Sequence, residues 1–168
     1  PASLVRMACT VPYRPRNCVW ELTLACNLRC QHCGSRAGCR RDDELTAAEA
    51  LDVVEQLADL GCELVTLSGG EPLLRDDWEG IAQAVSRRGI AVNMVTNGTL
   101  VDPATARRIA ASGMANVGVS IDGPPDLHDE IRGAGTYDRT ARGIRHLREA
   151  GVPVAVMTTI NRRNLPLL

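Results

Sequence analysis

The stretch "CELVTLSGGEP", Cys62–Pro72, is a β-branched apolar run that ends in two glycines. Such a run, bounded by glycine, is typical of a buried strand. Comparable runs recur along the chain, and a helical pattern separates each from the next. They are "VWELTLAC" (19–26), "IAVNMVTN" (90–97), "ANVGVSID" (115–122) and "VPVAVMTT" (152–159). Strands that alternate with helices predict a parallel sheet flanked by helices.

The segments between these runs carry the start and stop signals of helices. Thr46 and Glu49 have the spacing of a capping box, and Asp102 followed by Pro103 is a typical cap and first-turn pair. The helices are expected to begin near Thr46, Asp76 or Asp77, Asp102 and Tyr137, and to end near Gly61, Gly89, Gly113 and Gly151. Four strand–helix–strand units in series imply right-handed crossovers, in either an open sheet or a closed barrel.

The segments that follow the strands are rich in polar residues, glycine and cysteine. They read "CNLRCQHC", "SGGEP", "TNGT", "SIDG" and "TTIN". In both kinds of parallel sheet, ligands bind beyond the carboxyl ends of the strands. Glycine and asparagine also serve as ordinary turn residues, but cysteines crowded at the same edge indicate a functional site.

The composition is that of an ordinary globular domain. The chain has 168 residues, 45% of them hydrophobic and 23% charged, and its formal net charge is -1. This balance offers nothing to attract nucleic acid or an anionic membrane, no run approaches the roughly 20 apolar residues of a membrane span, and no signal peptide opens the sequence. We therefore expect a cytoplasmic protein whose seven cysteines are thiols, metal ligands or catalytic groups.

Three cysteines, Cys26, Cys30 and Cys33, fall within eight residues after the first strand. A structural zinc ion would need a fourth ligand. The candidates for that ligand are Cys39, Cys18, Cys9 and His32. A cubane iron–sulfur cluster would instead use three thiolates for three irons and leave the fourth iron open to a reacting ligand. The spacing alone allows both readings.

The motif "CNLRCQHC" resembles the cluster motif of the radical S-adenosylmethionine (SAM) superfamily, at the position where that family places it. The family has an aromatic residue where this chain has His32, whose imidazole can also pack against adenine. "SGGEP", one unit downstream, resembles the family segment that holds the amino group of SAM. The resemblance thus implies cofactor contacts from Ser68, Gly69, Gly70, Glu71 and Pro72, and cluster ligation by Cys26, Cys30 and Cys33.

Two further matches are shorter. "SIDGPPDLHDEIRG" resembles a segment of the peptide-modifying (SPASM-type) branch in which a serine and an arginine contact SAM, here Ser120 and Arg132. A guanidinium can pair bidentately with the methionine carboxylate. Asp122 falls on the same face of the strand as Ser120. "TNGT" makes Asn97 a further candidate contact.

The resemblance implies a mechanism. A reduced [4Fe-4S] cluster would pass an electron to SAM, and the resulting 5′-deoxyadenosyl radical would remove hydrogen from a peptide or another large substrate, or from a small molecule such as a porphyrin. Flavodoxin or ferredoxin would supply the electron. Such an enzyme serves peptide or cofactor maturation. The alternatives are a non-catalytic zinc or iron–sulfur binding module and an inactive truncated core.

The resemblance also predicts the architecture, a partial (β/α)6 TIM-like barrel with about five strands and four to five helices. The sequence stops before a sixth β/α unit, so we expect an N-terminal segment, 1–17, and a truncated core, 18–168, whose first and fifth strands are exposed edges. Outside the site, His128 and Asp129 resemble a solvated loop pair. Cys62, Trp20 and Trp78 are expected in the core.

Overall fold

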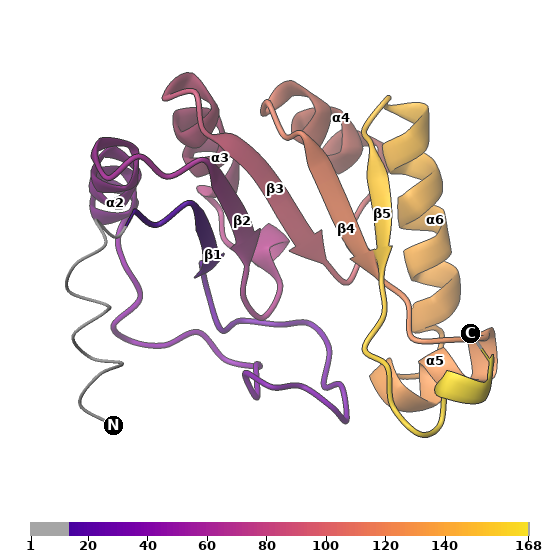
Figure 1. Ribbon diagram of the computed structural model, residues 1–168. Coiled ribbons are helices and arrows are strands. Elements are labelled where there is room, and N and C mark those ends of the chain that lie inside the picture. Colours follow the sequence, from indigo (N-terminus) through magenta and orange to yellow (C-terminus); the bar gives the residue numbers. More distant parts are fainter. Residues whose placement is uncertain (1–13, 168) are drawn as a thin grey trace, which may run out of the picture.

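The computed structural model describes residues 14–167, so Cys9 and most of the predicted segment 1–17 lie outside the described residues. Its centre is a sheet of five parallel strands, arranged in chain order from one edge to the other (Figure 1). The strands are β1 (Asn17–Glu21), β2 (Leu64–Ser68), β3 (Ala91–Thr96), β4 (Asn116–Ser120) and β5 (Val154–Met157). The predicted parallel α/β fold is confirmed.

Residues 14–167 contain five α-helices and two short 3-10 helices, all of which connect strands except the last 3-10 helix, which follows β5. They are α2 (Ala47–Asp59), η1 (Pro72–Leu74), α3 (Trp78–Arg87), α4 (Pro103–Ala111), α5 (Pro125–Arg132), α6 (Thr136–Glu149) and η2 (Leu165–Leu167). The capping box at Thr46 and Glu49 is present, and the carboxylate of Asp102 accepts a 2.7 Å hydrogen bond from the N–H of Thr105. None of the helices in this part of the chain combines the length and the apolar character that a membrane crossing requires.

Helix α5 was not predicted from the sequence. The consecutive prolines at its start read as a loop, yet Pro125 is the first helical residue, where a missing N–H and a fixed φ do no harm. The helix buries His128 completely. The interpretation of His128 and Asp129 as a solvated loop pair was therefore wrong for the histidine.

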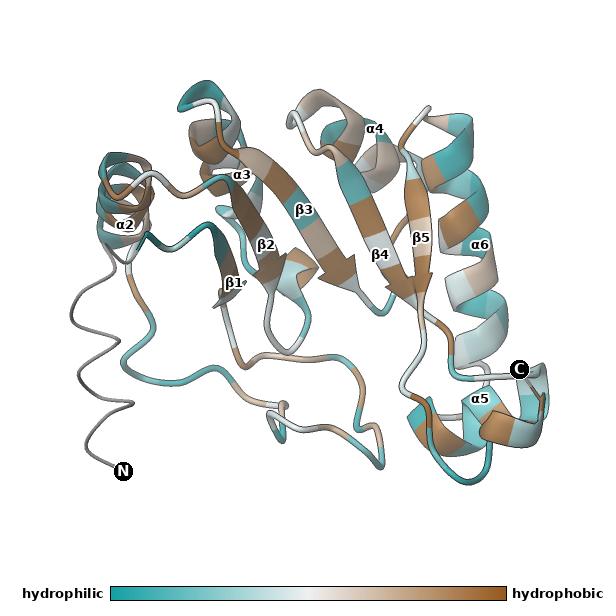
Figure 2. Cartoon of the chain, viewed as in Figure 1, coloured by the Kyte–Doolittle hydropathy of each residue, from teal (hydrophilic) through white to brown (hydrophobic). Residues whose placement is uncertain are grey.

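The hydrophobic core lies between one face of the sheet and the helices. Alternate strand residues such as Val65, Met94 and Val119 are fully buried and belong to one cluster with helix residues such as Ile81 and Leu147. In Figure 2, the brown colour of hydrophobic residues covers β2 and much of β3. Of the residues expected in this core, Trp78 and Cys62 are buried and Trp20 is partly buried against it.

The opposite face of the sheet is more polar. Thr66, Asn93 and Asn116 stand in register on neighbouring strands and are only partly buried. Strands β1 and β5 form the two edges, as predicted, and they expose Val19 by 73% and Val156 by 59%. The sheet is thus an open, partial barrel.

All five strands run in the same direction, so their carboxyl ends share one edge of the sheet (Figure 1). At this edge the first strand ends earlier than predicted. The N–H of Leu22 still bonds to the carbonyl of Ser68, but the carbonyls of Thr23 and Ala25 then accept from the glycine loop after β2. The chain leaves the sheet there and begins the long loop that contains the three cysteines.

Candidate functional site

A cavity of about 280 Å³ opens at the carboxyl edge of the sheet. Its wall brings together the cysteine loop, the glycine loop, the ends of β3 and β4, and the end of α5. Most of the residues selected from the sequence line it. They are Cys26, Cys30, His32, Cys33, Ser68, Gly69, Gly70, Asn97, Ser120 and Arg132. Glu71, Pro72 and Asp122 are not part of this wall.

The glycine loop and the cysteine loop pack backbone against backbone. The N–H of Gly70 donates to the carbonyl of Thr23 at 2.7 Å, and the N–H of Glu71 donates to the carbonyl of Ala25 at 2.8 Å. A Cβ atom on Gly69 would lie 2.4 Å from the oxygen of Thr23, and one on Gly70 would lie 2.3 Å from the oxygen of Ala25. Only glycine permits this approach, which brings the backbone of "SGGEP" beside the thiols.

Glu71 turns away from the cavity and is fully buried. Its carboxylate accepts hydrogen bonds from the hydroxyl of Thr96 at 2.7 Å, the N–H of Asn97 at 2.9 Å and the N–H of Leu73 at 3.3 Å. Burial raises the pKa of Glu71, and these hydrogen bonds oppose the rise. The side chain of Glu71 therefore ties the glycine loop to the end of β3, and only its backbone is near the site.

Asn97 connects the end of β3 to the cysteine loop. Its side-chain N–H donates to the Oδ1 of Asn27 at 2.9 Å, and its own Oδ1 accepts from the N–H of Thr99 at 2.9 Å. The backbone carbonyl of Asn97 accepts from the hydroxyl of Thr140 on α6. Asn97 lines the cavity while its amide is already engaged with protein groups.

Glu44 supports the cysteine loop, and the sequence did not reveal it. Its Oε1 accepts hydrogen bonds from the N–H of Leu24 at 2.8 Å, the hydroxyl of Thr23 at 3.0 Å and the N–H of Arg41 at 3.1 Å. Burial would raise the pKa of this carboxyl, but these hydrogen bonds together hold its pKa below the usual value. No local motif marks a glutamate that acts on residues twenty positions earlier.

The three thiols of the cysteine loop face the same cavity. The Sγ of Cys26 accepts from the N–H of Leu28 at 3.4 Å, and the Sγ of Cys33 accepts from the N–H of Ala37 at 3.3 Å. Burial raises the pKa of Cys26 and of Cys30, while the nearby charge of Arg132 acts in the opposite direction on Cys30. Metal ions bind thiolates, so ligation here would displace protons.

The other described cysteines lie elsewhere. Cys62 is buried before β2, Cys18 is partly buried on β1, and Cys39 is exposed beyond the cysteine loop. None of them lines the cavity. In residues 14–167, no three His, Cys, Asp or Glu side chains surround one point closely enough to hold a single metal ion.

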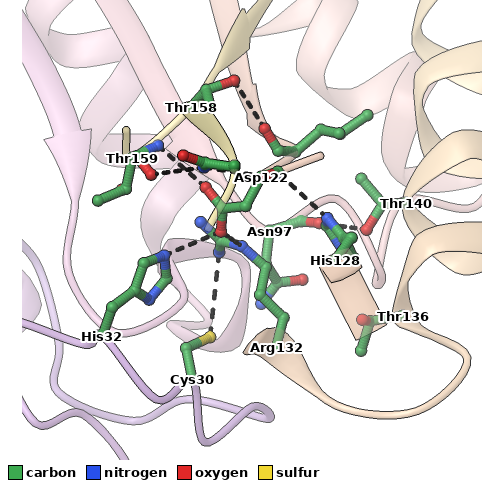
Figure 3. Close-up of polar contacts among 12 residues, drawn as sticks. Cys30, His32, Asn97, Asp122, His128, Arg132, Thr136, Thr140, Thr158 and Thr159 are labelled. Carbon is green, nitrogen blue, oxygen red and sulfur yellow. Dashed lines mark hydrogen bonds and ion pairs between the residues drawn. The ribbon is translucent and has the colours of Figure 1, made fainter. Parts of the chain in front are cut away.

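Behind the cavity wall, the carboxylate of Asp122 joins three segments (Figure 3). Its Oδ2 accepts from the Nε of Arg132 at 2.6 Å and pairs with the Nε2 of His32 at 2.8 Å, while its Oδ1 accepts from the N–H of Thr159 at 2.9 Å. Burial would raise the pKa of Asp122. The hydrogen bonds from Arg132 and Thr159, together with the positive charge of Arg132, instead hold this pKa below its usual value. The Nη1 of Arg132 lies 4.0 Å from the Sγ of Cys30.

The backbone of Asp122 is fixed as well. Its N–H donates to the Nδ1 of His128 at 3.2 Å, and its carbonyl accepts from the side-chain amide of Asn164 at 3.0 Å. Burial and the charge of Arg132 lower the pKa of His128, in agreement with a ring nitrogen that accepts a hydrogen bond. Asp122 is completely buried, and we call it and its side-chain partners His32, Arg132 and Thr159 the Asp122 hub.

A match to the model of the Radical SAM superfamily covers residues 20–164. The chain belongs to the radical SAM superfamily. This match includes the cysteine loop, the glycine loop and the Asp122 hub. Members of the superfamily are enzymes that use a [4Fe-4S] cluster and SAM, and the five-stranded sheet is part of their TIM-like barrel.

Several curated proteins are similar in sequence. An AdoMet-dependent heme synthase of Methanosarcina barkeri is 42% identical over 154 residues, which are 90% of this chain and 44% of that protein. A mycofactocin maturase, MftC, of Mycobacterium tuberculosis is 36% identical over 151 residues, which are 89% of this chain and 39% of that protein. The chain therefore spans less than half the length of these relatives.

Solved structures agree on the fold. SuiB of Streptococcus suis bound to S-adenosylmethionine superposes with a TM-score of 0.78 at 21% identity, over 93% of this chain and 36% of that one. The enzyme anSMEcpe with bound AdoMet and a peptide superposes with a TM-score of 0.73 at 20% identity, over 89% of this chain and 44% of that one. The open sheet thus has the fold of a partial TIM-like barrel.

The cavity suits the two cofactors of the superfamily by its donor chemistry. Three thiols are the ligands that iron in such clusters requires, and the loop that bears them is held by Glu44 and Asn97. The backbone of Gly69 and Gly70 and the guanidinium of Arg132 lie on the same wall, where they can meet the polar groups of an amino acid.

Proposed function

We propose that this chain is the cofactor-binding part of a radical SAM enzyme that abstracts hydrogen from a peptide substrate. One observation carries the proposal. The three thiols share a single cavity with the glycine loop and Arg132, although these groups come from distant parts of the sequence. When bound and reduced, the cluster would supply the electron that splits SAM into methionine and a 5′-deoxyadenosyl radical.

The residues of the chain have separate roles in this proposal. Cys26, Cys30 and Cys33 would bind the cluster through their thiolates and would leave one iron free for SAM. The backbone of Ser68–Gly70 would hold the amino group of the methionine moiety, and Arg132 and Ser120 would hold its carboxylate. The ring of His32 would pack against the adenine. Together these groups orient SAM and exclude water from it.

Anaerobic reconstitution with iron and sulfide tests the proposal. We expect about four irons and four sulfides per chain, as in a cubane cluster. We also expect 5′-deoxyadenosine after SAM and a one-electron donor such as flavodoxin or ferredoxin are added. Replacing Cys26, Cys30 or Cys33 with alanine should abolish both the cluster and the cleavage. Cys39→Ala, at an exposed cysteine outside the cavity, is the matched control.

Other outcomes would point to the alternatives. One zinc ion per chain without cleavage of SAM would indicate a binding module. A cluster of the expected composition that never cleaves SAM would indicate an inactive core. Both results contradict the proposed enzyme. A cytoplasmic location stays a prediction, which localisation of a tagged full-length protein would check.

The peptide substrate is supported by the mycofactocin maturases among the relatives and by the peptide-bound neighbour structure. A tetrapyrrole is the second candidate, because heme synthases and an Fe-coproporphyrin III synthase of Methanosarcina barkeri are also similar. The full-length protein decides between them. It should form 5′-deoxyadenosine faster with its own substrate, and deuterium from a labelled peptide or a labelled porphyrin should then appear in that product.

A further inference from the structure

The Asp122 hub fixes two side chains of the cavity from behind. Asp122 itself is completely buried and does not line the cavity, whereas both His32 and Arg132 do. Its carboxylate lies 2.6 Å from the Nε of Arg132 and 2.8 Å from the Nε2 of His32. The residue therefore cannot touch a ligand in the cavity, but it sets the direction of two residues that can.

The geometry of Arg132 shows what the hub leaves free. A guanidinium is a planar fork with five N–H donors, and Asp122 engages only the Nε edge. Among the described residues, the terminal nitrogen Nη1 of Arg132 contacts the Sγ of Cys30 at 4.0 Å. The bond to Asp122 thus leaves both Nη groups available to a ligand, in the arrangement that a carboxylate accepts bidentately.

The geometry of His32 is fixed in the same way. An ionised carboxylate only accepts hydrogen bonds, so the Nε2 of His32 carries its hydrogen toward Asp122. The other ring nitrogen, Nδ1, is buried without a partner among the described residues. The bond to Asp122 therefore fixes which edge of the ring faces the hub.

We propose that Asp122 is a positioning residue for SAM binding, and this inference rests on the proposed function. Asp122 holds the guanidinium fork of Arg132 toward the methionine carboxylate and the ring of His32 toward the nucleoside. The bond from Thr159 and the bonds to its backbone keep Asp122 itself in place. Partners of this kind, which orient a ligand from behind, commonly change affinity or activity by roughly 10- to 100-fold.

The first test replaces Asp122 with asparagine. Asp122→Asn keeps the shape of the side chain but replaces one carboxylate oxygen with an NH2 group. That group must then face either Arg132 and His32 or the N–H of Thr159, all of which are donors. We expect SAM to bind the reconstituted chain about 10- to 100-fold more weakly in equilibrium dialysis. Iron and sulfide contents should stay unchanged. Asp122→Glu retains the negative charge but moves it, so its affinity for SAM should fall between those of the unaltered chain and Asp122→Asn.

The second test does not depend on the cofactors. In the metal-free chain, ¹⁵N NMR of the histidine rings should show His32 with its hydrogen on Nε2. In Asp122→Asn the signals of the two ring nitrogens should approach each other, because the preference for Nε2–H is lost. A ring whose nitrogen signals do not change would show that the pair with Asp122 does not orient His32.

Two control variants separate positioning from a general loss of structure. Asp129→Asn, on α5 with Arg132, weakens hydrogen bonds to the start of α6 without touching the cavity, so it should lower stability but leave SAM affinity unchanged. Asp126→Asn changes an exposed carboxylate on that helix and should alter neither. Equal losses of SAM affinity in Asp122→Asn and in Asp129→Asn would overturn the proposal.

A further variant applies if Asp122→Asn does not fold. Arg132→Lys keeps the positive charge beside Asp122 but lacks the fork, so SAM should again bind about tenfold or more weakly. Binding of SAM by Arg132→Lys as tightly as by the unaltered chain would refute the role of the fork. If the unaltered chain neither holds a cluster nor cleaves SAM, the proposed function fails, and the NMR measurement still tests the hub.

Discussion

Gly70 is the single residue on which the contact between the two site loops depends most directly. A Cβ atom at this position would lie 2.3 Å from the backbone oxygen of Ala25, so one of the two loops would have to move. We expect Gly70→Ala to lower the free energy of unfolding by about 1–3 kcal/mol. Denaturant unfolding measures this loss.

Gly80→Ala is the matched control for that substitution. Gly80 lies in α3, and a Cβ atom there would meet nothing within 4 Å. Alanine in a helix is favoured over glycine by about 0.5–1 kcal/mol, so this variant should be slightly more stable than the unaltered chain. Equal effects of the two substitutions would show that the close approach of the loops is not what matters.

Glu44 offers a second prediction at a single residue. Glu44→Ala leaves the N–H of Leu24 without its acceptor at the base of the cysteine loop. Loss of a buried partner costs about 1–3 kcal/mol, and local opening should let trypsin cut faster after Arg29 or Arg36 inside the loop. Glu44→Gln keeps an oxygen acceptor and should protect the loop nearly as well. Trypsin cleavage that stays slow in Glu44→Ala would contradict the prediction.

Single residues also show where prediction from the sequence ended. The thiols, the glycines and Arg132 were found because their motifs are local. The direction of the Glu71 side chain was not predicted, because its carboxylate bonds to Thr96 and Asn97, which lie twenty-five residues or more away in the sequence. Local spacing predicts which residues reach the same edge of the sheet. It does not predict which way a buried side chain then turns.

Among the elements, the junction of α5 and α6 depends on one carboxylate, that of Asp129. It accepts from the N–H of Gly135 at 2.6 Å and from the N–H of Tyr137 at 2.7 Å. The hydrogen bond from Tyr137, with further ones from Gly135 and Thr136, holds the pKa of Asp129 below its usual value. The folded state therefore favours the ionised form of this side chain.

This pKa shift predicts a pH dependence with a definite sign. Because the pKa is lower in the folded chain, the stabilisation is present above the unfolded pKa of about 4 and is lost as the pH falls through the folded value. Asp129→Asn should therefore be less stable at neutral pH and should lose less stability on acidification. Thermal unfolding between pH 7 and pH 3 measures both effects. Parallel curves for the two proteins would contradict the assignment.

The elements themselves were largely predictable. Periodicity found all five strands, and start signals such as Asp102 and Thr46 placed the beginnings of α2, α3, α4 and α6 within two residues. Helix α5 was missed because Pro124 and Pro125 resemble a turn until the buried His128 is seen. Strand ends were overestimated where backbone groups bond to a neighbouring loop, as after Leu22.

For the whole molecule, the two open edges of the sheet are the main liability. Strand β5 and the residues after it expose Val156 by 59%, Met157 by 47% and Ile160 by 63%. Unpaired edge strands with apolar side chains are templates for association. We expect the chain alone to self-associate at high concentration, and Val156→Lys to reduce this in sedimentation velocity.

Leu51→Lys is the control for this prediction. Leu51 is 43% exposed on α2, on the side of the sheet far from β5 (Figure 1), so its replacement should leave association through the β5 edge unchanged. A chain that stays monomeric at every concentration tested would show that its edges need no cover.

The Asp122 hub bears on how such a protein is made. His32 belongs to the first loop of the sheet, but the hub also contains Thr159 and is held by Asn164, and both of these leave the ribosome much later. During translation the thiols emerge before the groups that support their surroundings. Iron delivered at that moment would meet a loop without its scaffold, so cluster assembly should follow synthesis of the domain rather than accompany it.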